Sequence, residues 1–73
     1  MSEATWSEFG GAWLKDQIVD GRLERRVFTS DPRQDNNARL DQIIEFSGPT
    51  DESSSRTGWA DGEGNIDWGT WES

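Results

Sequence analysis

The chain has 73 residues and a formal net charge of −8, with 15 acidic and seven basic side chains. A chain of this length forms one small domain and buries only about 60% of its unfolded surface. Its acidity disfavours direct binding to nucleic acid or to an anionic membrane surface, because like charges repel, and favours binding to a basic protein surface.

The composition narrows the chemistry further. Cysteine and histidine are absent, so we expect no disulfide, no metal site and no cofactor. Without His, Cys or Tyr, proton transfer would rest on carboxylates and a single Lys, so we expect a protein that is not an enzyme. The start of the chain has neither a basic segment nor an apolar run, and this predicts a cytoplasmic location, in a host cell if the source is viral.

Residues 1–11 contain Thr5 and Glu8 at the spacing of a helix capping box. This spacing predicts one helical turn that starts at Trp6 and ends at Gly10-Gly11, with Trp6 and Phe9 on one side. The alternative is a mobile terminus, which is common at chain ends.

Residues 12–29 carry the strongest local signal. Asp20-Gly21 separates two apolar-rich runs and suits a type I′ turn, so we predict a hairpin with strands over about 12–19 and 22–29. A two-residue loop then pairs Trp13 with Phe28 and Ile18 with Leu23. The alternative is a short helix over 12–19.

Alternation of side chains along these strands sorts them into two faces. One face carries Leu14, Ile18, Leu23 and Val27, together with an opposite-charge pair between Asp16 and Arg25. The other face carries Lys15, Gln17, Arg22, Glu24 and Arg26, with Trp13 and Phe28 at its open end.

The next two segments are a loop and a third element. Residues 30–37 form a polar loop that exposes Arg33, because Ser-Asp-Pro favours a turn. Residues 38–46 fit a strand with Leu40, Gln42, Ile44 and Phe46 on one face, or a short helix capped by Asn37. We favour the strand, packed against the apolar face of the hairpin.

Residues 49–73 contain six acidic residues, one Arg and three of the five Trp residues. The run Thr50-Asp51-Glu52-Ser53-Ser54-Ser55 is typical of a flexible linker, so we predict an acidic, largely flexible tail after a small domain over 1–48. In the alternative, Asp61–Gly64 forms a turn and Trp59, Ile66 and Trp68 fold back onto the hairpin.

One motif in this tail matches a calcium loop in part. Asp61, Glu63, Asn65, Asp67 and Glu72 occupy ligand positions of such a loop. Ile66 stands where the loop needs glycine, and no helical pattern follows, so we do not expect calcium binding.

These features predict a small mainly-β or α+β protein that acts as an acidic protein-interaction module. Its size and charge are typical of phage-encoded regulators that bind a host nucleic-acid enzyme, most plausibly RNA polymerase, and act on transcription by steric occlusion. The predicted anchors, chosen because Trp and Arg dominate binding hot spots, are Trp6, Trp13, Arg33, Trp59, Trp68 and Trp71.

Three alternatives remain open at this stage. The protein could inhibit a nuclease or DNA-binding protein by mimicking DNA. It could bind single strands through the Trp13 and Phe28 end of the hairpin, with an acidic tail that recruits a partner. A homodimer through the hairpin edge is a further option, because an unpaired strand edge invites strand addition.

Overall fold

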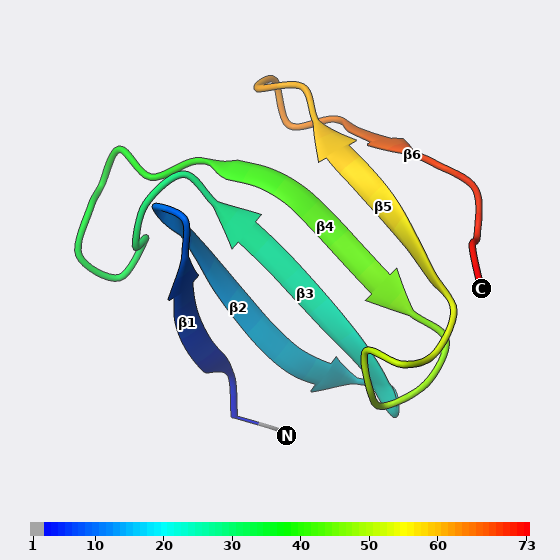
Figure 1. Ribbon diagram of the computed structural model, residues 1–73. Helices are drawn as coiled ribbons and strands as arrows, with labels where there is room; N and C mark the ends of the chain where they lie inside the picture. Colours follow the sequence, from blue (N-terminus) through cyan, green and yellow to red (C-terminus); the bar gives the residue numbers. More distant parts are fainter. Residues whose placement is uncertain (1–2) are drawn as a thin grey trace.

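The computed structural model describes residues 3–73 as one antiparallel sheet in which sequence neighbours are also spatial neighbours (Figure 1). The six strands are β1 (Thr5–Phe9), β2 (Ala12–Val19), β3 (Arg22–Phe28), β4 (Leu40–Phe46), β5 (Ser55–Ala60) and β6 (Ile66–Trp68). The prediction of a mainly-β antiparallel fold is confirmed at this level. Among the described residues there is no helix, and so none that could span a membrane.

The central hairpin of β2 and β3 has the predicted register. Trp13 pairs with Phe28 and Ile18 with Leu23, and the ladder runs without a break down to the turn. Asp20 and Gly21 both have positive φ, at 55° and 78°, as a type I′ turn requires. The local turn chemistry and the two-residue alternation therefore agree, and the alternative helix over 12–19 is wrong.

The N-terminal segment corrects the predicted helical turn. Residues 5–9 form β1, which pairs with β2 through Phe9 and Ala12. Gly10 and Gly11 have φ of 60° and 88°, so they form a second two-residue hairpin turn instead of ending a helix. Strand alternation separates Trp6 from Phe9, which is 80% exposed.

Strand β4 confirms the strand prediction for 38–46, with one correction to its faces. The register of β3 against β4 shifts between Val27 and Phe28, where the pairing moves from Gln42 to Leu40. This bulge turns Leu40 toward the face of Phe28 and away from that of Gln42. Strand β4 extends the sheet beside β3. The prediction that this segment packs against the apolar face of the hairpin is therefore wrong.

The largest correction concerns the flexible acidic tail expected over 49–73. Strand β5 pairs with β4, and β6 pairs with β5. The Ser-rich run makes the turn between β4 and β5, where the Ser47 N–H donates to the Ser54 carbonyl at 2.8 Å and the Gly48 N–H to Ser53 Oγ at 3.1 Å. The alternative prediction, a turn over Asp61–Gly64, is closer to the structure, because the chain reverses there and Ile66 and Trp68 lie in β6 at the edge of the sheet.

The sheet has two distinct faces. Register and alternation place one set of side chains on what we call the aliphatic face: Leu14, Asp16, Ile18, Leu23, Arg25, Val27, Gln42, Ile44, Phe46, Thr57 and Trp59. The opposite set forms the tryptophan face: Trp6, Trp13, Lys15, Arg22, Glu24, Arg26, Phe28, Ile43, Glu45, Arg56, Gly58 and Trp68. The buried apolar core is small, with Ile43 8% and Phe46 6% exposed, one on each face.

Candidate functional site: a tryptophan face with two arginine clusters

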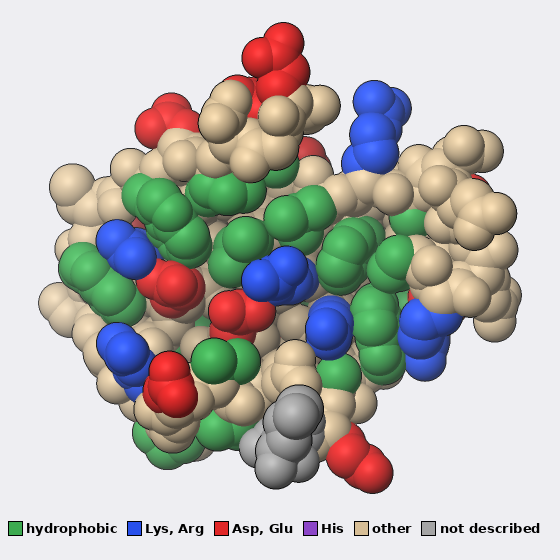
Figure 2. All heavy atoms as spheres, turned by 180° about the vertical axis from the view of Figure 1, so that it is seen from behind, with side chains coloured by type: hydrophobic (Ala, Val, Ile, Leu, Met, Phe, Trp, Pro, Cys, Tyr) green, Lys and Arg blue, Asp and Glu red, His purple; other side chains and the backbone are tan. Residues whose placement is uncertain are grey.

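The tryptophan face gathers hydrophobic side chains and sets several Lys and Arg side chains among them (Figure 2). This mixture has a simple origin in the sequence. Aromatic and basic residues alternate with aliphatic ones along β2 and β3, so the sheet sorts them to opposite sides. Of the basic residues within the strands, Lys15, Arg22, Arg26 and Arg56 lie on the tryptophan face and Arg25 lies on the aliphatic face.

The first cluster is built around Arg33, from the loop between β3 and β4. Its guanidinium carbon lies 4.5 Å from the ring centre of Trp6 and 5.6 Å from that of Trp13. The Phe28 ring lies 5.8 Å from Trp6. A cation at these distances interacts favourably with an aromatic ring, so Arg33 holds two strands and a loop together.

Asp31 determines where Arg33 points. Arg33 Nε donates to Asp31 Oδ1 at 3.0 Å and Nη2 donates to Oδ2 at 3.1 Å, while the Arg33 N–H donates to Oδ1 at 3.0 Å. Asp31 is only 7% exposed. The hydrogen bonds from Arg33 hold the pKa of Asp31 below its usual value of 3.8, so the carboxylate stays charged.

The loop that carries this pair is held by its own hydrogen bonds. The Asp31 carbonyl accepts from the N–H groups of Gln34 at 3.1 Å and Asp35 at 2.8 Å. The Asp35 carboxylate accepts from Ser30 Oγ at 2.6 Å and from the Asn37 N–H at 2.8 Å. These bonds, that of Ser30 above all, lower the pKa of Asp35. The polar residues that predicted this loop therefore also supply the hydrogen bonds that order it.

The second cluster repeats this chemistry at the other side of the sheet. The Arg56 guanidinium carbon lies 4.3 Å from the ring centre of Trp68 and 5.3 Å from that of Trp71. Arg56 Nε and Nη2 each lie 2.7 Å from Glu45 Oε1. Each cluster is thus an Arg that contacts two Trp rings and is held by one carboxylate.

Two backbone features bring Trp68 and Trp71 to Arg56. Gly58 lies between Ile43 of β4 and Trp68 of β6, and a Cβ atom there would clash with Ile66 and approach the Trp68 ring to within 2.9 Å. Beyond β6, the N–H groups of Ser55 and Glu72 donate to each other's carbonyl at 2.8 and 2.7 Å. This bridge keeps the last residues alongside β5.

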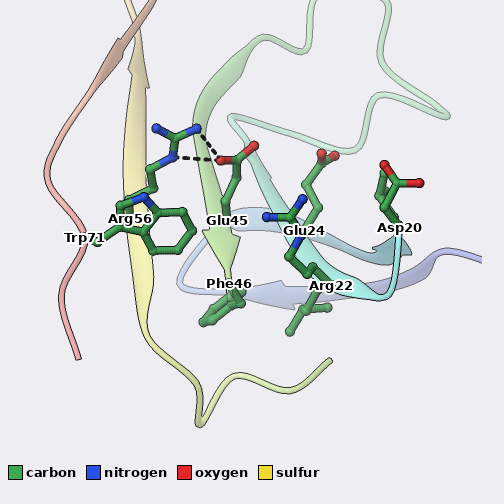
Figure 3. A pocket seen from close by; sticks show the side chains of 9 residues that line it. Asp20, Arg22, Glu24, Glu45, Phe46, Arg56 and Trp71 are labelled. Atoms are coloured by element: carbon green, nitrogen blue, oxygen red, sulfur yellow. Dashed lines mark hydrogen bonds and ion pairs between the residues drawn. The ribbon is translucent and has the colours of Figure 1, made fainter. Parts of the chain in front are cut away.

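A pocket of about 290 Å³ lies beside the second cluster. Arg56 and Trp71 form one side of it, with Glu45 between Arg56 and Glu24, while Arg22 and Asp20 close the far side (Figure 3). Glu24 and Glu45 are direct cross-strand neighbours, an arrangement that repels. Each is neutralised by its own Arg, since Arg26 Nε lies 2.8 Å from Glu24 Oε1.

The sequence-predicted anchors therefore fall into two clusters and one outlier. Trp6, Trp13 and Arg33 form the first cluster. Trp68 and Trp71 join the second. The outlier is Trp59, which is 54% exposed on the aliphatic face.

Sequence reasoning missed the partners that orient these anchors: Asp31, Glu45 and Arg56. A usable signal existed for Arg56, which is the only basic residue among residues 49–73, a segment that also contains Trp68 and Trp71. No comparable signal marked Glu45, because its pairing depends on the register of β4 against β5.

The acidic motif with calcium-loop spacing forms a turn. Asp61 Oδ1 accepts from the N–H groups of Glu63 at 2.8 Å and Asn65 at 3.2 Å, and these bonds lower the pKa of Asp61. Within residues 3–73 no group of three or more acidic side chains is placed to hold a metal ion.

Comparison of the chain with protein-family models, with curated proteins and with solved structures finds no match. The assignment of a function therefore depends on the geometry of this face. The ordered groups of this face are aromatic rings and paired charges.

Proposed function

We propose that this protein is a small acidic protein-interaction module that binds a larger protein through its tryptophan face. The observation that carries this proposal is the presence of two Arg clusters, each with two Trp rings, on one face of the sheet. Trp and Arg are the residues most enriched in binding hot spots.

Order within the clusters favours tight binding. Binding normally costs about 0.5–1.5 kcal/mol for each flexible side chain that becomes fixed. Arg33 and Arg56 are already held by Asp31 and Glu45 through charge-assisted hydrogen bonds. A partner would therefore meet side chains that have lost most of this freedom on folding.

The span of the face suits a protein surface. Trp6 and Trp68 are the two ends of one cross-strand row that runs through Lys15, Arg26, Ile43 and Gly58. Five steps between strands of about 4.8 Å separate them by about 24 Å along the sheet. Two anchors at this distance fit a standard interface of about 800 Å² on each partner.

The charge distribution suggests the kind of partner. The turns that border the sheet are acidic and include Asp20, Asp35, Asp61 and Glu63. With a net charge of −8, they would steer a basic surface toward the face, and the Trp rings would anchor it. Nucleic-acid enzymes carry such surfaces. We propose steric occlusion of one of them as a phage-type regulator would act, with RNA polymerase as the first to test.

A matched pair of variants tests this proposal. Trp71→Ala removes an anchor that is 46% exposed, and Phe9→Ala removes an aromatic ring that is 80% exposed and lies in neither cluster. Trp71→Ala should weaken binding to a purified RNA polymerase by about tenfold or more in calorimetric titration. Phe9→Ala should leave it unchanged, and affinity should fall as salt is raised. Equal losses in both variants, or no binding to any nucleic-acid enzyme at low salt, would refute the proposal.

A second candidate function is binding of single-stranded nucleic acid. It is favoured by one observation, that Lys15, Arg22 and Arg26 share the face of the Trp rings. Deletion of residues 49–73 is unsuitable as a test, because it removes β5 and β6. Fluorescence titration with an oligothymidine decides instead: binding that Lys15→Glu abolishes supports this function, and no quenching at low salt excludes it. A DNA mimic is less well supported, because the acidic residues lie mostly in turns.

A further inference from the structure

We infer that the aliphatic face binds a second copy of this chain, so that two sheets pack face to face as a β-sandwich. This inference is independent of the function proposed above, which uses the opposite face. It starts from a rule of protein architecture: a sheet with an apolar face is stable only when another layer covers that face.

No second layer exists within the described chain. All six strands of residues 3–73 belong to one sheet, and this part of the chain has no helix. The loop over 47–54 crosses one end of the aliphatic face, where Asp51 Oδ2 lies 3.7 Å from Arg25 Nη2 (Figure 1). Phe46 is buried near this end.

The other end of the face remains open. One cross-strand row there joins Leu14, Val27, Gln42 and Trp59. Leu14, Val27 and Ile44 of the adjoining row are only half-buried, and Trp59 is 54% exposed. Leucine and valine on an inward-facing sheet position are normally covered by a facing layer.

The whole chain exposes more surface than a folded monomer of its mass normally does. The surface is 5213 Å² for a mass of 8.3 kDa, whereas a folded monomer of this mass exposes about 4,600 Å². The excess of about 600 Å² on each copy would give an interface of about 1,200 Å² in total, at the lower end of stable specific interfaces.

Charge favours a second copy over a basic partner. The one acid–base pair in the middle of this face, Asp16 and Arg25, is closed by two hydrogen bonds of 2.8 and 3.0 Å. From Leu14 to Trp59 the open row carries no charged side chain, so a basic surface would find no partner there and an identical row meets no repulsion. The row ends at Asp67 on the edge strand β6, and Asp51 lies at the other end of the face; both carboxylates are exposed.

Equilibrium sedimentation of the full chain tests the inference with three variants that each add one negative charge. Trp59→Glu and Gln42→Glu place the charge on the open row, and Val19→Glu places it on the tryptophan face, at a residue 43% exposed. We expect the unaltered chain and Val19→Glu to reach twice the monomer mass, and the other two to dimerise at least tenfold more weakly. Circular dichroism verifies that each variant is folded.

Salt provides a second measurement. Two copies of a chain with charge −8 repel one another, so dimerisation through an apolar face should strengthen as salt is raised. Partner binding through the tryptophan face should weaken, and the two proposals can therefore fail separately. The inference is overturned if the chain is still monomeric at about 0.5 mM, a concentration far above the dissociation constant of a stable dimer. It is equally overturned by a dimer that Val19→Glu disrupts and Trp59→Glu does not.

Discussion

Gly58 is the position where one added methyl group tests the packing of the sheet most directly. It is buried in β5, and a Cβ atom there would overlap Ile66 Cγ2 and lie 2.9 and 3.0 Å from two carbons of the Trp68 ring. Replacing a strand Gly by Ala normally stabilises a protein by about 0.4–1 kcal/mol through the unfolded state. Overpacking costs about 1–3 kcal/mol. We therefore expect Gly58→Ala to lower the free energy of unfolding by about 1–2 kcal/mol.

The control and the assay follow from the same geometry. At Gly48 a Cβ atom would meet nothing closer than Ser53 Cβ at 3.4 Å, so Gly48→Ala should change stability by less than about 0.5 kcal/mol. Urea unfolding followed by circular dichroism measures both. Because the clash involves Ile66, Gly58→Ala should cost less in an Ile66→Ala background. A Gly58→Ala variant as stable as the unaltered chain would show that β6 does not pack on Gly58 and refute the reasoning.

Three further predictions concern stability. Gly21→Ala forces a residue with a Cβ to adopt φ of 78°, so it should destabilise the hairpin by about 1–2 kcal/mol in urea unfolding, whereas Arg22→Ala next to it should not. Asp16→Asn leaves Arg25 without its charged partner in a half-buried site, and should cost about 1–2 kcal/mol, with most of the loss absent in an Arg25→Gln background. The pKa of Asp31 is lowered on folding, so its contribution to stability is complete above the unfolded value of 3.8 and is lost as the pH falls through its lower folded value. Asp31→Asn should flatten this acid-side slope in unfolding curves recorded from pH 5 downward, and an unchanged slope would contradict the assignment.

Much of the fold was predictable where local chemistry and periodicity agree. Asp20-Gly21 determines the register of β2 and β3, because a two-residue turn there admits one pairing and a slip by one residue would reverse the faces. Gly10-Gly11 carried the same signal, but the apparent capping box of Thr5 and Glu8 competed with it. The pairing of β1 with β2 joins ten residues in one hydrogen-bonded ladder, whereas a single helical turn would join far fewer.

The C-terminal strands were not predictable by the same reasoning. Residues 55–60 contain Ser, Arg, Gly and Ala, which do not favour strands, and only two residues that do, Thr57 and Trp59. They form β5 because β4 offers an open edge, and because Gly58 leaves room for the Trp68 ring. Strand formation over residues 55–60 therefore depends on pairing with β4 and not on the strand propensity of the segment itself.

The sequence by itself determined the number of Trp and Arg side chains, the absence of His and Cys, and the central hairpin with its two faces. These properties are local or compositional, so they need no knowledge of distant contacts. Only the tertiary structure decided that Arg33 and Arg56 each lie over two Trp rings, and that both clusters share one face while Trp59 lies on the other. The physical reason is that a strand's face is set by its register against its neighbour, and the registers of β4, β5 and β6 arise from pairings that no short stretch of this sequence encodes.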